Sequence, residues 1–173
     1  MTRLIIAALA LLFCAGAGAV QPFVVGIGDE APEAAGIVLQ GPAGTKLSQL
    51  RGRVVLVDFW ASYCGPCLES MPELNRMRDQ LFREGYADDF EILSVATDNE
   101  VAKSRRFLER VKVDFPVVAD QIGISVQTYK LWRLPSAYLV DRRGRVRMIY
   151  AGYGSGYTAE LKQRVLGLLQ QPN

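Results

Sequence analysis

Histidine is absent from the 173-residue chain. Catalysis by a Ser-His or Cys-His pair is therefore excluded, as is a metal site with histidine ligands. An excess of charge of one sign is also lacking, because 20 basic and 18 acidic residues give a formal net charge of +2. This balance indicates neither a nucleic-acid partner nor an acidic membrane surface. Half of the residues are hydrophobic, and the length suffices for one domain with a core.

Long hydrophobic runs are confined to the N-terminus. Arg3 provides a short positive segment, residues 4–13 are apolar, and Ala17-Gly18-Ala19 fits a cleavage site. We therefore expect residues 1–19 to be a signal peptide. The alternative is a membrane anchor, because the apolar stretch continues to Val20 and approaches the shortest length that spans a bilayer. Either outcome predicts an exported protein that is periplasmic or anchored to the membrane facing the periplasm.

Cysteine is scarce, with three residues in the whole chain. Cys14 lies in the expected signal peptide, so the mature protein keeps Cys64 and Cys67. An even pair of cysteines suits an oxidising compartment. Residues 20–36 are rich in Gly, Pro and Ala and are expected to form a lead-in segment, followed by a single domain over residues 37–173.

The hydrophobic pattern predicts alternating strands and helices. Residues 54–60, V-V-L-V-D-F-W, form an apolar run typical of a central strand buried on both faces. Asp98 or Asn99 is expected to cap the second helix. The expected strands are 37–40, 54–60, 91–97, 115–118, 137–141 and 146–151, and the expected helices are 64–83, 99–112, 125–131 and 157–169. This order predicts an α/β domain in which helices flank a mixed central sheet.

The motif Cys64-Gly-Pro-Cys67 lies where the buried strand meets the first helix. At a helix N-terminus the free backbone N–H groups favour a thiolate, so Cys64 is the expected nucleophile. Cys67 follows one turn later, close enough to form a disulfide, and as the more buried thiol it is expected to resolve mixed disulfides. An inert local disulfide is the structural alternative, although such a short loop removes little chain entropy. A zinc site is disfavoured, because no further cysteine or histidine is available in the mature chain.

The segment V-L-V-D-F-W-A-S-Y-C-G-P-C resembles the active-site strand and helix of the thioredoxin family, and Pro72 matches the proline that kinks this helix. The segment R-L-P-S-A-Y-L-V-D-R-R-G-R-V resembles the family's cis-proline segment and following hairpin. The lead-in G-D-E-A-P, the segment G-T-K-L-S-Q-L-R-G and the extra helix are similar to the exported TlpA/ResA-like branch. The resemblance covers about residues 26–170.

This resemblance implies a thioredoxin-like fold with an N-terminal β-hairpin extension and an extra helix. It also implies disulfide exchange with protein substrates, without a cofactor or metal. Cys64 would attack and Cys67 would resolve the mixed disulfide. Pro135 would follow a cis peptide bond and face the disulfide, and the backbone of Leu134 would pair with an extended substrate segment.

Four features depart from the branch's usual pattern, and one is the run Pro135-Ser136-Ala137, where a threonine is usual. Tyr63 replaces the tryptophan before the first cysteine, Ser70 replaces a glutamate, and Asp58 stands where asparagine is common. Asp58 is the one acid in the apolar run, and burial is expected to raise its pKa toward neutrality. We therefore predict that Asp58 has taken the proton-transfer role of the missing glutamate. The alternative is an aspartate that only bonds to neighbouring backbone groups.

The aromatic residues near the motif each allow two roles. Trp60 is a candidate for substrate contact, although packing beneath the active site is favoured. Tyr63 flanks the nucleophile and suits substrate contact and simple surface exposure equally. Tyr129 and Trp132 are candidates for an apolar substrate groove, with loop packing favoured for both.

These observations predict a thiol-disulfide oxidoreductase, most simply a reductase, because Gly-Pro is the dipeptide of thioredoxin, which is poised near ~−270 mV. A reductase in an oxidising compartment needs a supply of electrons, which we expect from a membrane partner. An oxidase or isomerase of the same fold is the second hypothesis. The third is a non-catalytic adaptor that binds extended peptides and keeps its cysteines permanently bridged.

Overall fold

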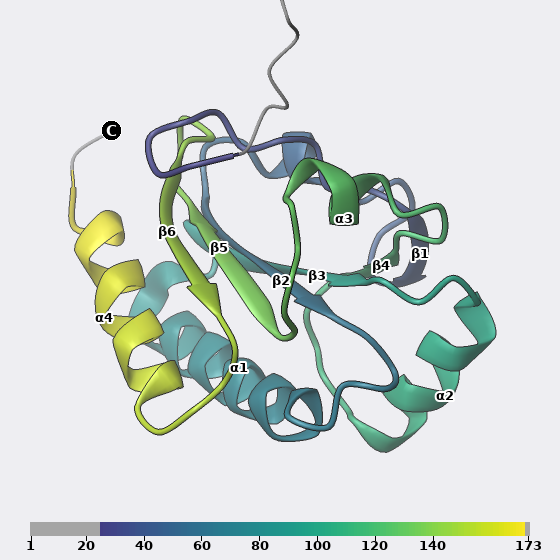
Figure 1. The fold of residues 1–173 in the computed structure, drawn as a ribbon. Helices are drawn as coiled ribbons and strands as arrows, with labels where there is room; N and C mark the ends of the chain where they lie inside the picture. The colour runs from purple at the N-terminus through teal and green to yellow at the C-terminus, as the bar shows by residue number, and fades with distance from the viewer. Residues whose placement is uncertain (1–24, 172–173) are drawn as a thin grey trace, which may run out of the picture.

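The computed structural model of the chain describes residues 25–171, and the expected signal peptide at residues 1–19 lies outside this part. Six strands form one mixed sheet in the order β1-β4-β3-β2-β5-β6, with helices on both faces (Figure 1). The strands are β1 Ile37–Gln40, β2 Val54–Trp60, β3 Phe90–Ala96, β4 Val117–Ala119, β5 Ser136–Val140 and β6 Val146–Ala151. The helices are α1 Cys67–Leu81, α2 Val101–Arg110, α3 Ile124–Thr128 and α4 Tyr157–Leu169. The predicted α/β architecture is confirmed.

The central strand β2 is buried along its whole length, as its apolar run predicts. It runs parallel to β3 and antiparallel to β5. Because side chains alternate along a strand, Leu56 and Trp60 pack toward α1, α2 and α4, whereas Val57 and Phe59 pack toward the N-terminal segment and the residues around α3. Asp58 shares the face of Leu56 and Trp60, and it is the acid that this strand carries into the core.

The N-terminal segment joins the sheet through β1, which pairs antiparallel with β4 at one edge. The expected hairpin takes the form of an isolated antiparallel bridge between Ala35 and Lys46. Gly36 allows the close approach, because a Cβ at this position would lie 2.1 Å from the carbonyl oxygen of Ala119. Val25 and Ala34 are buried, so the described part of the lead-in packs onto the sheet. Within residues 25–171, no helix has the length and hydrophobicity that crossing a membrane requires.

Helix α1 begins at Cys67, three residues later than expected, and contains Pro72. The residues before it form tight turns: the N–H of Cys64 donates to the carbonyl of Ala61, and the N–H of Cys67 donates to the carbonyl of Cys64. Cys64 therefore precedes the helix by one turn instead of opening it.

Candidate active site

The two cysteines form a disulfide at the end of β2. The Cys64–Cys67 S–S distance is 2.03 Å, and the two Cα atoms are 5.4 Å apart. Cys67 is fully buried, whereas Cys64 keeps 7% of its surface exposed. Incoming thiols or disulfides therefore meet Cys64 first.

A buried carboxylate ties the loop before Cys64 to α2. Asp98 accepts hydrogen bonds from the backbone N–H of Ser62 at 3.0 Å, the Ser62 hydroxyl at 2.7 Å and the Ser104 hydroxyl at 2.8 Å. The expectation that Asp98 or Asn99 caps α2 is wrong, because Glu100 occupies the N-cap position and no side chain caps the helix. Since β2 and β3 are parallel, the residues that follow them emerge at the same edge of the sheet, and this brings Asp98 to Ser62.

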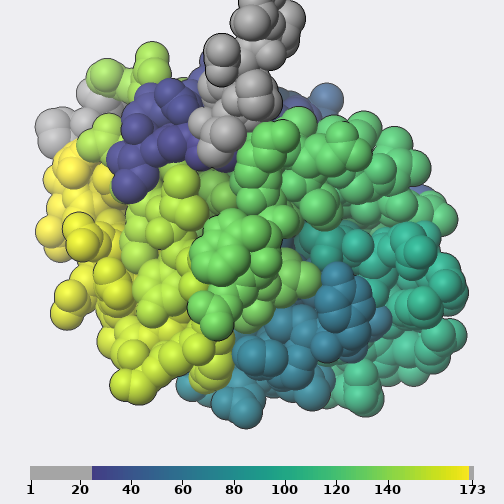
Figure 2. Space-filling model, in the orientation of Figure 1, coloured from purple at the N-terminus to yellow at the C-terminus, as the bar shows by residue number. Residues whose placement is uncertain are grey.

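A groove of about 480 Å³ lies beside Cys64. Its lining includes Tyr63 and Pro66 from the cysteine loop and Trp132, Arg133 and Leu134 from the segment before β5. Figure 2 shows the blue segment that carries the cysteines against the green segment that precedes β5. The Leu134–Pro135 peptide bond is cis, and Pro135 is buried. The structure thus brings Tyr63, Cys64 and Leu134 together on one surface.

Two aromatic residues frame this groove. Tyr63 and Trp132 are both 77% exposed, and the Arg133 guanidinium carbon lies 5.8 Å from the centre of the Trp132 ring. The prediction that Trp132 packs within its loop is wrong. Large exposed aromatic rings beside a nucleophile offer contact area to a partner protein.

Trp60 and Tyr129 lie in the core instead. Trp60 is fully buried and packs against Phe107 of α2, with ring centres 4.6 Å apart. It does not line the groove, so its candidate role in substrate contact is corrected to packing beneath the cysteine loop. Tyr129 is buried between Phe59 and Tyr138, and its hydroxyl donates to the carbonyl of Pro32 at 2.6 Å. It therefore supports the loop before Trp132 from inside.

Asp58 is fully buried, and burial raises its pKa from 3.8 to about 7, although the hydroxyl of Ser94 partly opposes this rise. Ser94 lies opposite it on β3. Ser94 lies close enough to lower this pKa, but neither carboxylate oxygen of Asp58 makes a hydrogen bond of normal geometry with a described residue. The structure therefore provides no backbone bond for the alternative role of Asp58. Ser70 of α1 is also buried, and its hydroxyl lacks a partner among the same residues.

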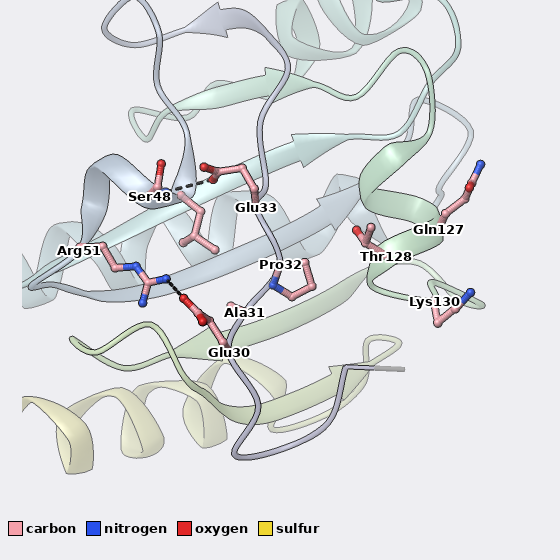
Figure 3. A pocket seen from close by; sticks show the side chains of 10 residues that line it. Glu30, Ala31, Pro32, Glu33, Ser48, Arg51, Gln127, Thr128 and Lys130 are labelled. Atoms are coloured by element: carbon pink, nitrogen blue, oxygen red, sulfur yellow. Dashed lines mark hydrogen bonds and ion pairs between the residues drawn. The ribbon is translucent and has the colours of Figure 1, made fainter. Parts of the chain in front are cut away.

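A second hollow, of about 650 Å³, shares no lining residue with the groove at Cys64 (Figure 3). Three of its four charged side chains are engaged within the protein, since Arg51 pairs with Glu30 at 2.6 Å and Glu33 accepts the N–H of Ser48 at 3.0 Å; the fourth is Lys130. It contains no cysteine. Within the described part of the chain, no cluster of three or more acidic or sulfur side chains is arranged to hold a metal.

Three features of this site differ from or go beyond the expectations from the sequence: the Asp98 network, Phe107 and the exposure of Trp132. Asp98 follows β3, which is parallel to β2. The strand order therefore predicts that Asp98 lies at the same edge of the sheet as the cysteines. Phe107 has the helical spacing of an inward residue in 99–112. No sequence signal indicated that Trp132 is exposed, because this depends on how the loop after α3 turns.

Comparison with known proteins agrees with this geometry. The model of the Redoxin family matches residues 27–163. The thiol-disulfide oxidoreductase ResA of Geobacillus kaustophilus is 31% identical over 128 residues, which make up 74% of this chain and 71% of that protein.

Two solved structures share the fold of this chain. A Chlorobium tepidum protein described as the thiol:disulfide interchange protein DsbE is 33% identical, with a TM-score of 0.74 over 84% of this chain and 99% of that chain. A Bacteroides thetaiotaomicron protein described as a protein disulfide isomerase is 27% identical, with a TM-score of 0.71 over 86% of this chain and 92% of that chain. With its cysteine pair in disulfide contact beside a groove, this chain belongs to the Redoxin family and is a TlpA/ResA-like thiol-disulfide oxidoreductase of the thioredoxin superfamily.

Proposed function

We propose that this protein is a reductase that acts on disulfides in exported proteins. The observation that carries the proposal is the pairing of Cys64, which keeps 7% of its surface exposed, with a fully buried Cys67 across Gly-Pro, beside a groove of about 480 Å³. The Gly-Pro dipeptide supports the reducing direction, since thioredoxin is poised near ~−270 mV.

The reaction follows from the positions of the two sulfurs. In the reduced protein, the Cys64 thiolate attacks a substrate disulfide, a mixed disulfide forms, and one substrate sulfur leaves as a thiolate that takes up a proton. Cys67 then loses its proton and attacks the sulfur of Cys64. The Cys64–Cys67 disulfide forms, the second substrate sulfur leaves, and the substrate has gained two electrons and two protons. A dithiol donor must reduce the pair before the next cycle.

Asp58 is the proposed proton acceptor for Cys67. A buried thiol ionises reluctantly, and the glutamate of the branch is replaced by Ser70, which is not a base near neutral pH. Asp58 lies on the face of β2 covered by α1, which begins with Cys67. With a pKa of about 7, its carboxylate is partly ionised at neutral pH and suited to take up a proton and release it.

The groove supports binding of an extended segment. The backbone of Leu134, which lines the groove, offers peptide groups for strand addition, and Tyr63 and Trp132 offer apolar contacts. We propose that these residues bind the substrate around its cysteine, with Trp60 acting only as packing.

The electron donor is proposed to be a membrane protein, because an exported reductase works against an oxidising compartment. The proposal includes residues 1–19 as a signal peptide or membrane anchor, as the sequence analysis expects.

Reduction of insulin by dithiothreitol tests whether the protein catalyses disulfide exchange, and equilibration with glutathione buffers tests the direction. A reductase accelerates insulin reduction and has a potential nearer ~−270 mV than the ~−180 mV of an isomerase or the ~−120 mV of a strong oxidant. Cys67→Ser should accumulate mixed disulfides with substrate proteins, and Cys64→Ser should not. A potential above ~−180 mV assigns the protein as an isomerase or oxidase. An inert disulfide that leaves insulin reduction unchanged assigns it as an adaptor.

A further inference from the structure

A group of buried polar atoms beneath α1 lacks hydrogen-bond partners within the described part of the chain. It includes both carboxylate oxygens of Asp58 and the hydroxyl oxygens of Ser70, Ser94 and Tyr157. Buried polar groups in folded proteins are almost always hydrogen-bonded, so several unpaired groups in one region require a specific reason. Sites of proton transfer are one such reason, because their groups must exchange partners during the reaction.

Tyr157 reaches this region from a separate element. It is the first residue of α4, and α4 packs against both β2 and α1 (Figure 1). The ring of Tyr157 is held by two other tyrosines, with ring centres 4.9 Å away for Tyr150 and 5.4 Å away for Tyr153. The side chain is therefore fixed, while its hydroxyl is unpaired.

Tyr157 is only 1% exposed, but it also borders a hollow at the surface. It lines a hollow of about 430 Å³ together with Tyr153, Glu69 and Glu73. Glu73 accepts a hydrogen bond of 2.5 Å from the hydroxyl of Thr158, which places its carboxylate beside the start of α4. Tyr157 thus contributes to both the buried region of Asp58 and a solvent-accessible hollow with acidic walls.

The pKa shifts of the tyrosines agree with a position of Tyr157 between Asp58 and the hollow. Burial raises the pKa of Tyr157 well above its ordinary value, and Asp58, the neighbouring tyrosines Tyr150 and Tyr153, and Glu73 raise it further. Burial and Glu73 also raise the pKa of Tyr153. Tyr157 therefore keeps its proton at any working pH, and its hydroxyl both donates and accepts hydrogen bonds.

We propose that Tyr157 connects Asp58 to the Glu73 hollow and forms the route by which the proton taken from Cys67 reaches solvent. This inference rests on the proposed function, in which Asp58 accepts that proton. The proton of Asp58 passes toward the Tyr157 oxygen, and the hydroxyl releases its own proton toward Glu73 or water in the hollow. One proton is transferred in total, and no phenolate accumulates.

Water molecules bridge the steps, because no direct hydrogen bond joins these side chains in the described residues. The other polar or titratable groups buried on this face include the unpaired indole nitrogen of Trp60 on β2, Ser94 on β3, and Cys67 and Ser70 on α1. The residue opposite Asp58 on β5 is Ala137, which offers no polar side chain. Tyr157 is therefore the group that α4 contributes, and it acts on the reaction through Asp58, as a positioning residue.

The test replaces Tyr157 with phenylalanine, which removes the hydroxyl and keeps the ring. Tyr150→Phe is the matched control, because Tyr150 packs against the same ring and is half-buried. Stopped-flow kinetics separate the attack of Cys64 from the resolution by Cys67 between pH 6 and 8, and ¹³C NMR of the Asp58 carboxyl reports its titration. Tyr157→Phe should leave the first step unchanged and slow the second by about tenfold, below the ~10²-fold expected for losing the acid itself. Asp58 should titrate at higher pH, since its carboxylate loses a donor that reaches it through bridging water.

A second variant tests the same route without changing the core, so that a folding defect in Tyr157→Phe cannot be mistaken for loss of the hydroxyl. Glu73→Gln changes the rim of the hollow, not the core, and should slow resolution in the same direction by a smaller factor. Equal behaviour of Tyr157→Phe, Tyr150→Phe and wild type in rate and pH profile overturns the proposal, as does equal slowing of both steps in Tyr157→Phe. A wild-type protein without disulfide exchange instead refutes the proposed function. The NMR titration then still decides the link, because it shifts in Tyr157→Phe only if the hydroxyl reaches Asp58.

Discussion

Replacing Asp58 with asparagine removes a carboxyl group whose ionisation opposes folding. Burial raises the pKa of this group from 3.8 to about 7, so the folded protein binds its proton more tightly than the unfolded chain. The protonated group stabilises the fold below about pH 4, and this contribution is lost as the pH rises through about 7. Wild type should therefore lose stability over this range relative to Asp58→Asn.

The structure sets the size of the effect. At about 1.36 kcal/mol per pH unit, a rise from 3.8 to about 7 corresponds to about 4 kcal/mol of unfolding free energy. Asp58 is fully buried, so solvent screening does not reduce this figure. Domains of this kind are stable by only ~5–15 kcal/mol, so the change is large. Other buried acids, such as Glu91 and Asp98, are present in both proteins and cancel in the comparison.

Urea unfolding of the oxidised proteins at pH 4, 6 and 8 measures this effect. The unfolding free energy of Asp58→Asn minus that of wild type should increase by about 4 kcal/mol from pH 4 to pH 8. The cost of burying an asparagine amide does not depend on pH, so it does not affect this increase. Asp88→Asn is the control, because Asp88 is exposed, and its difference from wild type should stay constant. A difference for Asp58→Asn that is equal at pH 4 and pH 8 would refute the reasoning.

Three further predictions concern the reaction. Asp58→Asn should slow resolution of the mixed disulfide by about 10²-fold and leave the attack by Cys64 nearly unchanged, and adding Ser70→Glu should restore part of the rate, as stopped-flow kinetics will measure. Trp132→Ala should raise the KM for a protein substrate by about tenfold with little change in kcat, because an exposed aromatic contact is lost. Ile27→Ala removes a comparably exposed apolar side chain outside the groove and should have no effect; an equal rise in both variants would contradict the assigned groove. Cys64 should react with iodoacetamide well below pH 8.5, and reaction only above that pH would exclude an activated thiolate.

The hydrophobic pattern of the sequence was sufficient to predict the central architecture. The continuous apolar run at residues 54–60 became β2, which is buried on both faces, and the turn R-R-G-R became the connection between β5 and β6. These predictions were right because burial and turn chemistry act locally. The predicted start of α1, at Cys64, is three residues too early. The residues from Ala61 to Cys67 form tight turns, which the sequence pattern does not distinguish from the first turn of a helix.

The sequence by itself determined the chemistry: two cysteines across Gly-Pro, one acid in a buried strand, and no histidine to suggest another mechanism. Only the tertiary structure decided which side chains surround that chemistry. It buried Trp60 against Phe107, exposed Trp132 at the groove, and moved Asp98 from a helix cap to the loop before Cys64. It also brought Tyr157 from the last helix to the region beneath α1. The reason is that these contacts join residues far apart in the chain, so they depend on how strands and helices pack, which local patterns do not specify.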